Sequence, residues 1–222
     1  MSLKIFIGYD PRQPLAYSVL QHSIIRHSSK PVSITPLVLK QLPIKRRGLT
    51  EFTYSRFLVP YLCGYSGSAI FMDADIAVTG DISELFDHAN YSFDVQVMQE
   101  QAKFEWASVM LFNNARCSAL TLEYIEDETH ALFDLAWARA VGHLPAEWNH
   151  CVGYKEPADA SLYHYTQGIP CWPETKGVED EPWILEAKAS LHTVSWHELM
   201  GSSVHAKAVA QRLKAEYDRR KP

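Results

Sequence analysis

The first eighty residues alternate apolar, strand-like runs with segments of helical periodicity, and this alternation constrains the fold more than any other feature. Strands are predicted at residues 3–7, 32–39 and 68–72, where short apolar runs are bounded by polar or turn-forming residues. Helices are predicted between them, at Pro14–His27, which a proline opens, and at residues 49–62. Because strands joined by crossover helices run parallel, this βαβαβ order predicts an α/β fold with a largely parallel sheet.

The rest of the chain is predicted to hold shorter elements. They are a helix at residues 82–86, strands at 93–98 and 108–112, a mostly helical stretch at 115–141 with a break at 128–130, and a strand-like run at 160–163. Residues 142–183 carry five prolines, and long loops of that kind are usually functional or flexible.

Composition places the chain among single-domain globular proteins. With 222 residues and 47% hydrophobic content, it is long enough for one sizeable core. The formal net charge of -5 argues against a nucleic-acid-binding surface. No apolar run approaches the roughly 20 residues that span a bilayer, and residues 1–7 lack the long apolar core of a signal peptide.

The cysteines Cys63, Cys117, Cys151 and Cys171 are widely spaced and form no Cys-x-x-Cys pair. This spacing argues against a zinc ribbon or a redox motif. We therefore predict reduced thiols in the core of a cytoplasmic protein.

The predicted strand at residues 68–72 runs directly into the carboxylates Asp73 and Asp75. Residues i and i+2 of a strand project to the same side, so both side chains reach one cation if the strand direction persists. Their oxygens suit Mg²⁺ or Mn²⁺. Carboxylates at the end of a buried strand are costly unless compensated, and such strand ends are where open α/β sheets bind ligands. The alternative is a solvated turn after the strand.

Three blocks of sequence, in this order, resemble the family 8 glycosyltransferases. Residues 53–60 carry Tyr and Arg and end in Pro, residues 69–75 run from an apolar strand into Asp-x-Asp, and residues 80–86 read Gly-Asp-Ile-Ser-Glu-Leu-Phe. Less specific matches are Leu-Pro-Ala-Glu-Trp-Asn at 144–149 and His-Tyr-Thr at 164–166. The resemblance implies a single GT-A domain over residues 1–202, a Rossmann-like mixed, mostly parallel sheet flanked by helices, followed by a tail at 203–222.

By this resemblance, Asp73, Asp75 and His164 would hold Mn²⁺ or Mg²⁺ on the diphosphate of a nucleotide sugar. His164 follows the strand-like run at 160–163, so a ligand distant in the chain can reach the same edge of the sheet. Imidazole nitrogen suits Mn²⁺. A lone histidine is otherwise a structural group, and the aspartate pair is what favours the ligand interpretation.

The resemblance also implies residues for the donor. Asp10 resembles the carboxylate that hydrogen-bonds the base or ribose, although turn chemistry before a proline explains it equally well. Gly8, Tyr9 and Ala74 are expected beside the donor. Arg56 occupies the position whose guanidinium reaches the donor sugar or diphosphate, for which a planar fork is well suited.

The chain departs from the family at the phosphate and at the base. Gln167 and Pro170 stand in the segment where the family carries a lysine that pairs with the diphosphate. Lys176 is the nearest basic residue that can serve instead, the alternative being a solvated loop lysine. Gln13 stands where the family has an aromatic side chain that stacks on uracil, so Tyr9 or Tyr17 is expected to replace it.

A further departure concerns the sugar pocket. Trp106 and Ser108 replace the family's asparagine and glycine, and glycine is the residue that permits close backbone approach to the sugar. The pocket for the donor sugar or acceptor is therefore predicted to be reshaped. The family's Asp-Gln pair has no clear match, and Asp134 is the nearest catalytic candidate.

The resemblance predicts transfer of a hexose from a nucleoside diphosphate sugar, UDP by family habit, to an acceptor hydroxyl of a sugar or glycan, with retention. One alternative is a haloacid-dehalogenase-like phosphatase, with Asp73 as nucleophile and Asp75 as general acid. Another is a catalytically silent protein that binds carbohydrate or nucleotide sugar. Residues 203–221 read as a basic amphipathic helix, which either packs on its own domain or contacts a membrane surface.

Overall fold

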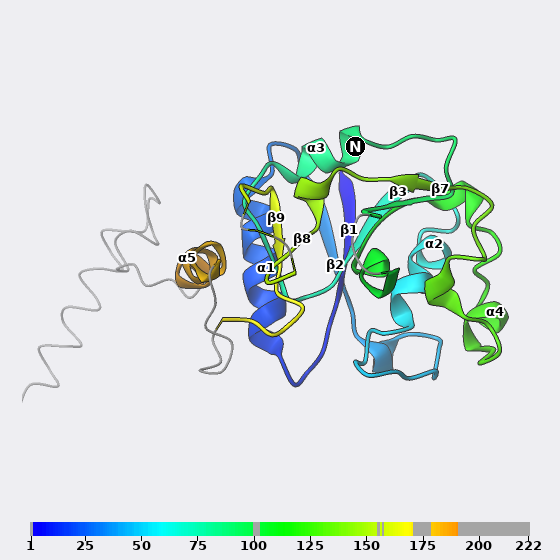
Figure 1. The fold of residues 1–222 in the computed structure, drawn as a ribbon. Coiled ribbons are helices and arrows are strands. Elements are labelled where there is room, and N and C mark those ends of the chain that lie inside the picture. Colours follow the sequence, from blue (N-terminus) through cyan, green and yellow to red (C-terminus); the bar gives the residue numbers. More distant parts are fainter. Residues whose placement is uncertain (1, 100–102, 155, 157, 171–178, 191–222) are drawn as a thin grey trace, which may run out of the picture.

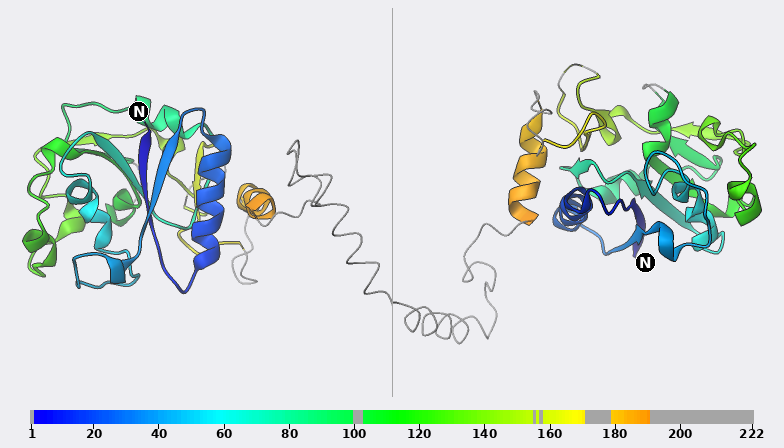
Figure 2. Two further views of the ribbon diagram at one scale, coloured as in Figure 1. Left: turned by 180° about the vertical axis from the view of Figure 1, so that it is seen from behind. Right: turned by 90° about the horizontal axis from the view of Figure 1, so that it is seen from below.

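The computed structural model describes residues 2–99, 103–154, 156, 158–170 and 179–190. Figure 1 shows a central sheet with α1 on one side and α2 and α4 on the other, and Figure 2 shows the same layers from behind and below. The fold is therefore a mixed α/β sandwich of helix, sheet and helix, as the sequence predicts.

The central sheet has six strands in the order β2-β1-β3-β6-β5-β7. Their bounds are β1 Leu3–Gly8, β2 Val32–Leu37, β3 Ser68–Met72, β5 Val95–Val97, β6 Val109–Asn113 and β7 Val141–His143. β1 pairs in parallel with β2 and β3, and β5 pairs in parallel with β7. Only β6 runs against both of its neighbours, so the prediction of a mostly parallel sheet is confirmed.

A second sheet of three short strands continues the chain beyond β3. It has the order β4-β9-β8, with β4 at Ile76–Val78, β8 at His150–Cys151 and β9 at Leu162–His164. β4 and β9 pair antiparallel, and Ile76 lies opposite His164. The pairing places His164 next to the strand that follows Asp75.

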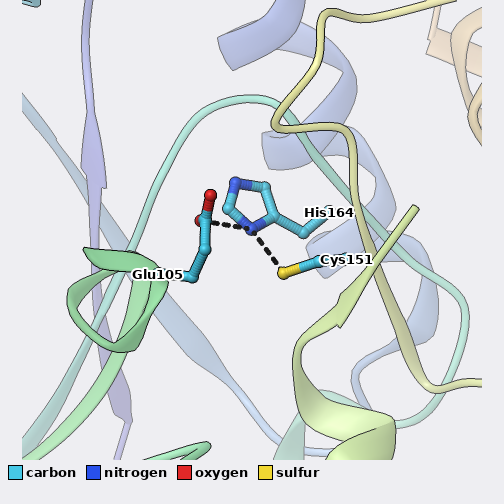
Figure 3. A group of neighbouring side chains, drawn as sticks. All are labelled: Glu105, Cys151 and His164. Atoms are coloured by element: carbon cyan, nitrogen blue, oxygen red, sulfur yellow. Dashed lines mark hydrogen bonds and ion pairs between the residues drawn. The ribbon is translucent and has the colours of Figure 1, made fainter. Parts of the chain in front are cut away.

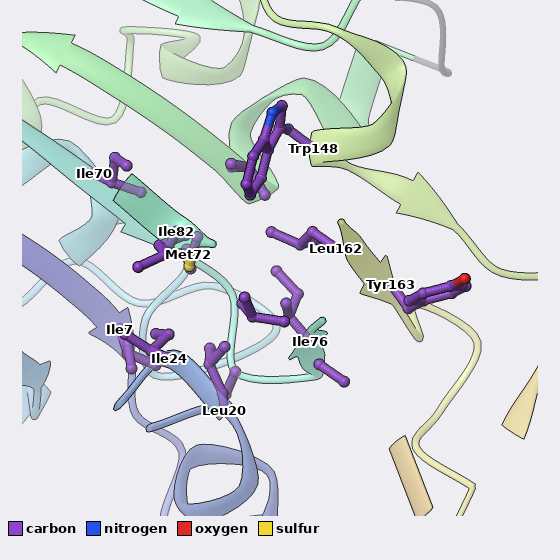
Figure 4. Close-up of a cluster of buried hydrophobic side chains, with 14 of the residues drawn as sticks. Ile7, Leu20, Ile24, Ile70, Met72, Ile76, Ile82, Trp148, Leu162 and Tyr163 are labelled. Atoms are coloured by element: carbon purple, nitrogen blue, oxygen red, sulfur yellow. The ribbon is translucent and has the colours of Figure 1, made fainter. Parts of the chain in front are cut away.

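Helix α1, Pro14–His27, covers one face of the sheet. Its buried residues, Ala16, Val19, Leu20, Ser23 and Ile24, recur every three or four positions, as expected for a helix with one apolar face. Figure 4 shows Leu20 and Ile24 packed beside Ile7 and Met72 from the strands. Helix α5, Asp180–Ser190, packs against α1 on the outside.

The other face is covered by shorter elements than the sequence predicts. In place of one helix over residues 49–62 there are turns, a 3₁₀ helix at Ser55–Leu58 and one α-turn, α2, at Val59–Leu62. The prediction of a mostly helical stretch at 115–141 is wrong. It holds α4, Leu122–Glu126, and 3₁₀ turns at Asn114–Arg116 and Leu132–Asp134. Aromatic and aliphatic side chains without regular helical spacing form the hydrophobic cluster on this face of the sheet.

The remaining predictions differ mainly at element ends. The strands predicted at 32–39, 93–98 and 108–112 are found as β2, β5 and β6, shifted or shortened by one to three residues. Helix α3, Ile82–Asp87, is present, and Asp81 caps it by accepting a hydrogen bond from Ser83 N at 2.9 Å. Strand β4 was not predicted, because three apolar residues carry too little periodic signal.

The structure also bears on the predictions about the cysteines, the C-terminal tail and membrane-spanning segments. Cys63, Cys117 and Cys151 are free thiols, two of them buried, whereas Cys171 lies outside the described residues. The predicted tail at 203–222 also lies outside them. Among the helices that the structure describes, none combines the length and apolar character needed to cross a membrane.

Asp94 precedes β5 and connects it to two loops through the hydrogen bonds of its buried side chain. Replacing it tests how much these bonds stabilise the fold. Its side chain is 1% exposed and accepts hydrogen bonds from Arg116 Nε at 2.6 Å and Arg139 N at 2.8 Å. Asp94→Asn should lower the free energy of unfolding by about 2–3 kcal/mol, because donors to a buried carboxylate lose their charged acceptor. Urea denaturation followed by circular dichroism measures the change.

The matched control is Asp87→Asn, which removes an exposed carboxylate that pairs with Lys30 and should cost at most about 1 kcal/mol. Burial opposes ionisation of Asp94, but its hydrogen bonds outweigh burial and hold its pKa below the usual range. A lowered pKa stabilises the fold above the unfolded-state value near about pH 4, and this contribution disappears as the pH falls further. Equal losses in both variants would contradict this account.

Candidate functional site

The two aspartates lie in the loop that joins β3 to β4, at the carboxyl end of β3. Backbone hydrogen bonds fix this loop on both sides: Asp73 N donates to Ser108 O, and Tyr165 N donates to Asp75 O, each at 2.9 Å. The loop is therefore clamped between the start of β6 and the end of β9. It brings His164 to the aspartates across a separation of about ninety residues in sequence.

Asp73, Asp75 and His164 each offer a ligand atom, and these atoms lie within 4.8 Å of one another. His164 Nε2 is 3.4 Å from Asp75 Oδ1. The histidine is buried, while the Asp73 and Asp75 side chains are 14% and 27% exposed. The structure thus gathers the three residues that the sequence selects as metal ligands.

Arg56 is turned toward the protein and contacts Asp73. Its Nη2 lies 2.9 Å from Asp73 Oδ1, its Nη1 donates to Ala107 O at 2.8 Å, and its Nε donates to Thr53 O at 3.0 Å. Three aromatic rings surround the guanidinium, those of Phe52, Phe71 and Phe133. These contacts position Asp73, whereas the predicted reach of Arg56 to a donor stays a prediction.

The charges of the cluster shift its pKa values. Burial raises the pKa of Asp73 to about 7, with Asp75 adding to the effect and Arg56 opposing it. Burial disfavours the charged form of His164, but the Asp75 carboxylate outweighs burial, so the pKa of His164 is raised well above its usual value. Two close carboxylates disfavour each other's ionisation, and a bound divalent cation would remove that penalty.

The donor set fits a divalent cation. Asp75 Oδ1 is buried and accepts no well-aligned hydrogen bond, and its neighbour is the imidazole of His164, whose Nε2 lies 3.4 Å away. Asp73 Oδ1 likewise has no well-aligned hydrogen bond, although it is ion-paired to Arg56. Two carboxylates with one imidazole suit Mn²⁺, and Mg²⁺ would use the same oxygens.

A cleft of about 300 Å³ opens beside the aspartates. Its lining combines the loops after β1 and β3, the turns before the 3₁₀ helix Ser55–Leu58, and residues that follow β9. They are Asp10, Gln13, Thr50, Phe52, Ala74, Asp75, Thr166, Gln167 and Gly168. An adjoining cleft of about 220 Å³ shares Asp10 and Thr50 and adds Arg12 and Arg47. Both clefts lie where α/β sheets bind ligands, at the carboxyl ends of strands.

Asp10 lines the cleft, and its carboxylate is engaged by its own turn. Arg12 Nε donates to Asp10 Oδ1 at 2.9 Å, and Arg12 N donates to the same oxygen at 2.9 Å. The Arg12 side chain lowers the pKa of Asp10 and burial raises it, and the net result is a pKa below the usual value. The turn interpretation of Asp10 therefore describes its contacts here, and its role toward a base stays a prediction.

Of the other residues expected beside the donor, Ala74 lines the cleft and Gly8 supports its wall. A Cβ on Gly8 would overlap the ring of Phe52, which is itself a lining residue. Tyr9 packs edge-on against Tyr17 at 5.5 Å between ring centroids, and neither lines the cleft. Phe52 is the aromatic residue present there, and sequence comparison missed it because it lies outside the expected segment.

The two remaining candidates do not join the cluster. Asp134 has a 59% exposed side chain that pairs with Lys103 at 3.7 Å, and it lies in the 3₁₀ turn Leu132–Asp134. No contact among the described residues ties it to Asp73, Asp75 or His164. Lys176 lies outside the described residues.

The sequence missed a buried polar group behind His164. Asn149 Oδ1 lies 3.2 Å from His164 Nδ1, Glu105 Oε2 lies 3.7 Å from the same nitrogen, and Cys151 Sγ lies 3.6 Å from it. Figure 3 shows the carboxylate and the thiol approaching this nitrogen, the first from the 3₁₀ helix Lys103–Ser108 and the second from β8. The nearest sequence signal was the Trp-Asn match at 148–149, which gave no role to the asparagine.

The Gly-Asp-Ile-Ser-Glu-Leu-Phe block has a structural explanation. Thr79 N and Gly80 N both donate to Ser161 O, and a Cβ on Gly80 would collide with the Ser161 side chain. Asp81 then caps α3. The block holds the segment that leads into β9, and so it fixes where His164 lies.

No protein-family model matches the chain. Among curated proteins it is similar to Protein CDI of Arabidopsis thaliana, with 33% identity in an alignment that covers 82% of this chain and 85% of that protein. The chain belongs to the Protein CDI family.

Solved structures place this member of the CDI family in a wider fold group. The glycosyltransferase GlyE of Streptococcus pneumoniae TIGR4 superimposes with a TM-score of 0.65 at 16% identity, over 84% of this chain and 60% of that one. The bifunctional glycosyltransferase WbbM gives 0.64 at 15% identity, over 95% and 51%. The galactosyltransferase LgtC, solved with donor and acceptor sugar analogues, gives 0.59 at 12% identity, over 87% and 98%.

These likenesses establish the GT-A glycosyltransferase fold for the CDI-family chain. It spans 60% of the length of GlyE and 51% of WbbM, so those proteins carry more chain than this one matches. The fold class predicted from the sequence is confirmed.

Proposed function

We propose that the protein is a metal-dependent glycosyltransferase of the family 8 type that transfers a hexose from a nucleoside diphosphate sugar, UDP first among the donors, to an acceptor hydroxyl with retention. The observation that carries the proposal is the convergence of Asp73, Asp75 and His164 beside a cleft at the carboxyl ends of β1 and β3. The GT-A fold supports it. The sugar or glycan acceptor binds next to the donor.

In this proposal Asp73, Asp75 and His164 would hold Mn²⁺ or Mg²⁺. When bound, the cation supplies Lewis-acid stabilisation of the negative charge that develops on the leaving diphosphate. Arg56 keeps Asp73 in place through its ion pair. Arg47, in the adjoining cleft, offers positive charge of the kind that the missing lysine would otherwise bring to the phosphates, whereas the Arg12 guanidinium is paired to Asp10.

Residues on the cleft wall select and orient the donor. Phe52 presents an aromatic surface for a base or sugar, and Thr50 and Gln167 present hydrogen-bonding groups. Ser108, in the position where the family has glycine, is buried and donates to Glu105 O. The chain thus differs from the family pattern at this position behind the cleft, which favours a changed choice of sugar or acceptor.

Calorimetric titration of the full chain with UDP, ADP and GDP tests the proposal. With Mn²⁺ present, we expect one of these nucleotides to bind at least about tenfold more tightly than without it, a gain of about 1.4 kcal/mol. Asp75→Ala should abolish the gain, because the cation loses a ligand.

Asp87→Ala is the control, since it removes an exposed carboxylate far from the cleft lining. Nucleotide binding that is unaffected by Mn²⁺, or that Asp75→Ala leaves intact, would overturn the proposal.

The silent-binding alternative has its own supporting observation, the absence of a described lysine from the cleft lining. It predicts metal-dependent nucleotide binding with no donor hydrolysis across a panel of nucleotide sugars. No observation favours the phosphatase alternative, in which Asp73 is a free nucleophile, because Asp73 is ion-paired to Arg56. Phosphate release from a chromogenic ester would restore it.

A further inference from the structure

The polar group behind His164 has the make-up of a metal site in its own right. Glu105, Cys151 and His164 each offer one ligand atom, and the three atoms lie within 4.8 Å of one another. All three residues are buried, and Cys151 is 0% exposed. Asn149, also 0% exposed, adds a carbonyl oxygen beside them. These residues surround Nδ1 of His164, whereas Asp75 faces Nε2 on the other side of the ring.

The spacing of these atoms matches a tetrahedral ion. Ligands about 2.0–2.3 Å from a shared tetrahedral centre lie about 3.3–3.6 Å from one another. From His164 Nδ1, the distances are 3.2 Å to Asn149 Oδ1, 3.6 Å to Cys151 Sγ and 3.7 Å to Glu105 Oε2. Cys151 Sγ lies 3.9 Å from Asn149 Oδ1. Adjustments of a few tenths of an ångström would close the shell.

We propose that Glu105, Cys151 and His164, with Asn149 as fourth ligand, form a buried site for Zn²⁺ or another thiophilic divalent cation. A thiolate and an imidazole favour Zn²⁺ and Co²⁺ over Mn²⁺ and Mg²⁺. One carboxylate and one thiolate balance the two charges of the ion, so the filled site is neutral, as a buried site requires. Binding releases the Cys151 thiol proton.

Hydrogen bonds from neighbouring residues hold the ligand atoms in place. Asn149 Nδ2 donates to Ser108 Oγ at 3.0 Å, which aims its oxygen at the imidazole. Glu105 Oε1 accepts a hydrogen bond from Thr166 Oγ1 at 2.7 Å, and Thr166 lines the cleft. Thr166 therefore stands between Glu105 and the cleft.

The two metal sites share one imidazole, so their occupancies are linked. His164 Nδ1 belongs to the thiolate site, whereas Nε2 faces Asp75. When an ion binds Nδ1, Nε2 carries the ring proton and donates it to Asp75. Nε2 then has no lone pair for a cation in the aspartate site unless the ring loses that proton as well. This consequence rests on the proposed function, whereas the thiolate site itself does not.

Cobalt titration of the full chain tests the thiolate site directly. Co²⁺ bound to a thiolate in a tetrahedral site gives a near-ultraviolet charge-transfer band and strong visible absorption. We expect both at one Co²⁺ per chain, lost in Cys151→Ser and retained in Asp73→Asn, which removes a ligand of the aspartate site but none of the thiolate site. Absence of the band from the wild type overturns the proposal.

Cys117→Ser is the matched control. Cys117 is also buried, but it donates to Asp94 O in the hydrophobic cluster on the α2 and α4 side of the sheet. The band should persist there, and a band that persists in Cys151→Ser as well overturns the proposal. X-ray absorption of the wild type with one equivalent of Zn²⁺ needs no variant. It should show a single sulfur at about 2.3 Å, and a shell of oxygen and nitrogen alone contradicts the site.

Discussion

Arg56→Met should lower the free energy of unfolding by about 3–5 kcal/mol, because it leaves a buried carboxylate without its cation. Arg56 contacts Asp73 at 2.9 Å and also satisfies the carbonyls of Thr53 and Ala107. Methionine fills similar volume among the three phenylalanine rings but offers no donor. Chemical denaturation at neutral pH, followed by fluorescence and circular dichroism, measures the loss.

The double variant Arg56→Met/Asp73→Asn separates the charge from the shape. Removing both charges should recover about half of the loss or more, since the cost lies in the unpaired carboxylate. Lys30→Met is the surface control, because Lys30 and Asp87 form an exposed pair. A double variant as unstable as the single one would show that Arg56 acts through its carbonyl contacts and ring packing.

Asp75→Asn should lower turnover of the preferred nucleotide sugar about 10²–10³-fold, comparable with the loss of one group that stabilises transition-state charge. Asp75 carries a buried oxygen that faces the His164 imidazole without a well-aligned hydrogen bond, and it lines the cleft. Release of nucleoside diphosphate, with water or a sugar as acceptor, measures turnover.

Asp134→Asn provides the comparison for this prediction. The Asp134 carboxylate is exposed and paired with Lys103, so its replacement should change turnover less than about threefold. If Asp134→Asn lowered turnover as much as Asp75→Asn, Asp134 would be a catalytic carboxylate, as the family resemblance predicts, although it lies outside the cluster.

The sequence predicts the sheet better than the helices, for a physical reason. β1, α1 and β3 carry uninterrupted apolar patterns that end at turn residues, and their bounds are found within one residue. Residues 115–141 carry many helix-forming side chains, yet the segment folds into short turns. Tertiary contacts, such as Trp137 Nε1 donating to Leu132 O and Phe112 stacking on Trp137, override propensity there.

The candidate site also contains residues that the sequence reveals and residues that it does not. Asp73 and Asp75 are visible locally as the end of a strand, and His164 is found through the order of motifs along the chain. Glu105 and Cys151 carry no local signal, because an acidic residue in a polar segment and an isolated cysteine are both common. Their relation to His164 exists only after β8 and β9 have paired. Their roles, like those of the aspartates, stay predictions until metal binding is measured.

The pairing of β4 with β9 ties the ligand set to the order of synthesis. Asp73 and Asp75 emerge early, but His164 reaches them only when β9 adds to β4, with Ile76 opposite His164. A nascent or truncated chain that ends before residue 162 therefore has the aspartates without the imidazole. High-affinity metal binding would then report that the far half of the protein has folded, and a partly made chain would not compete for the cation.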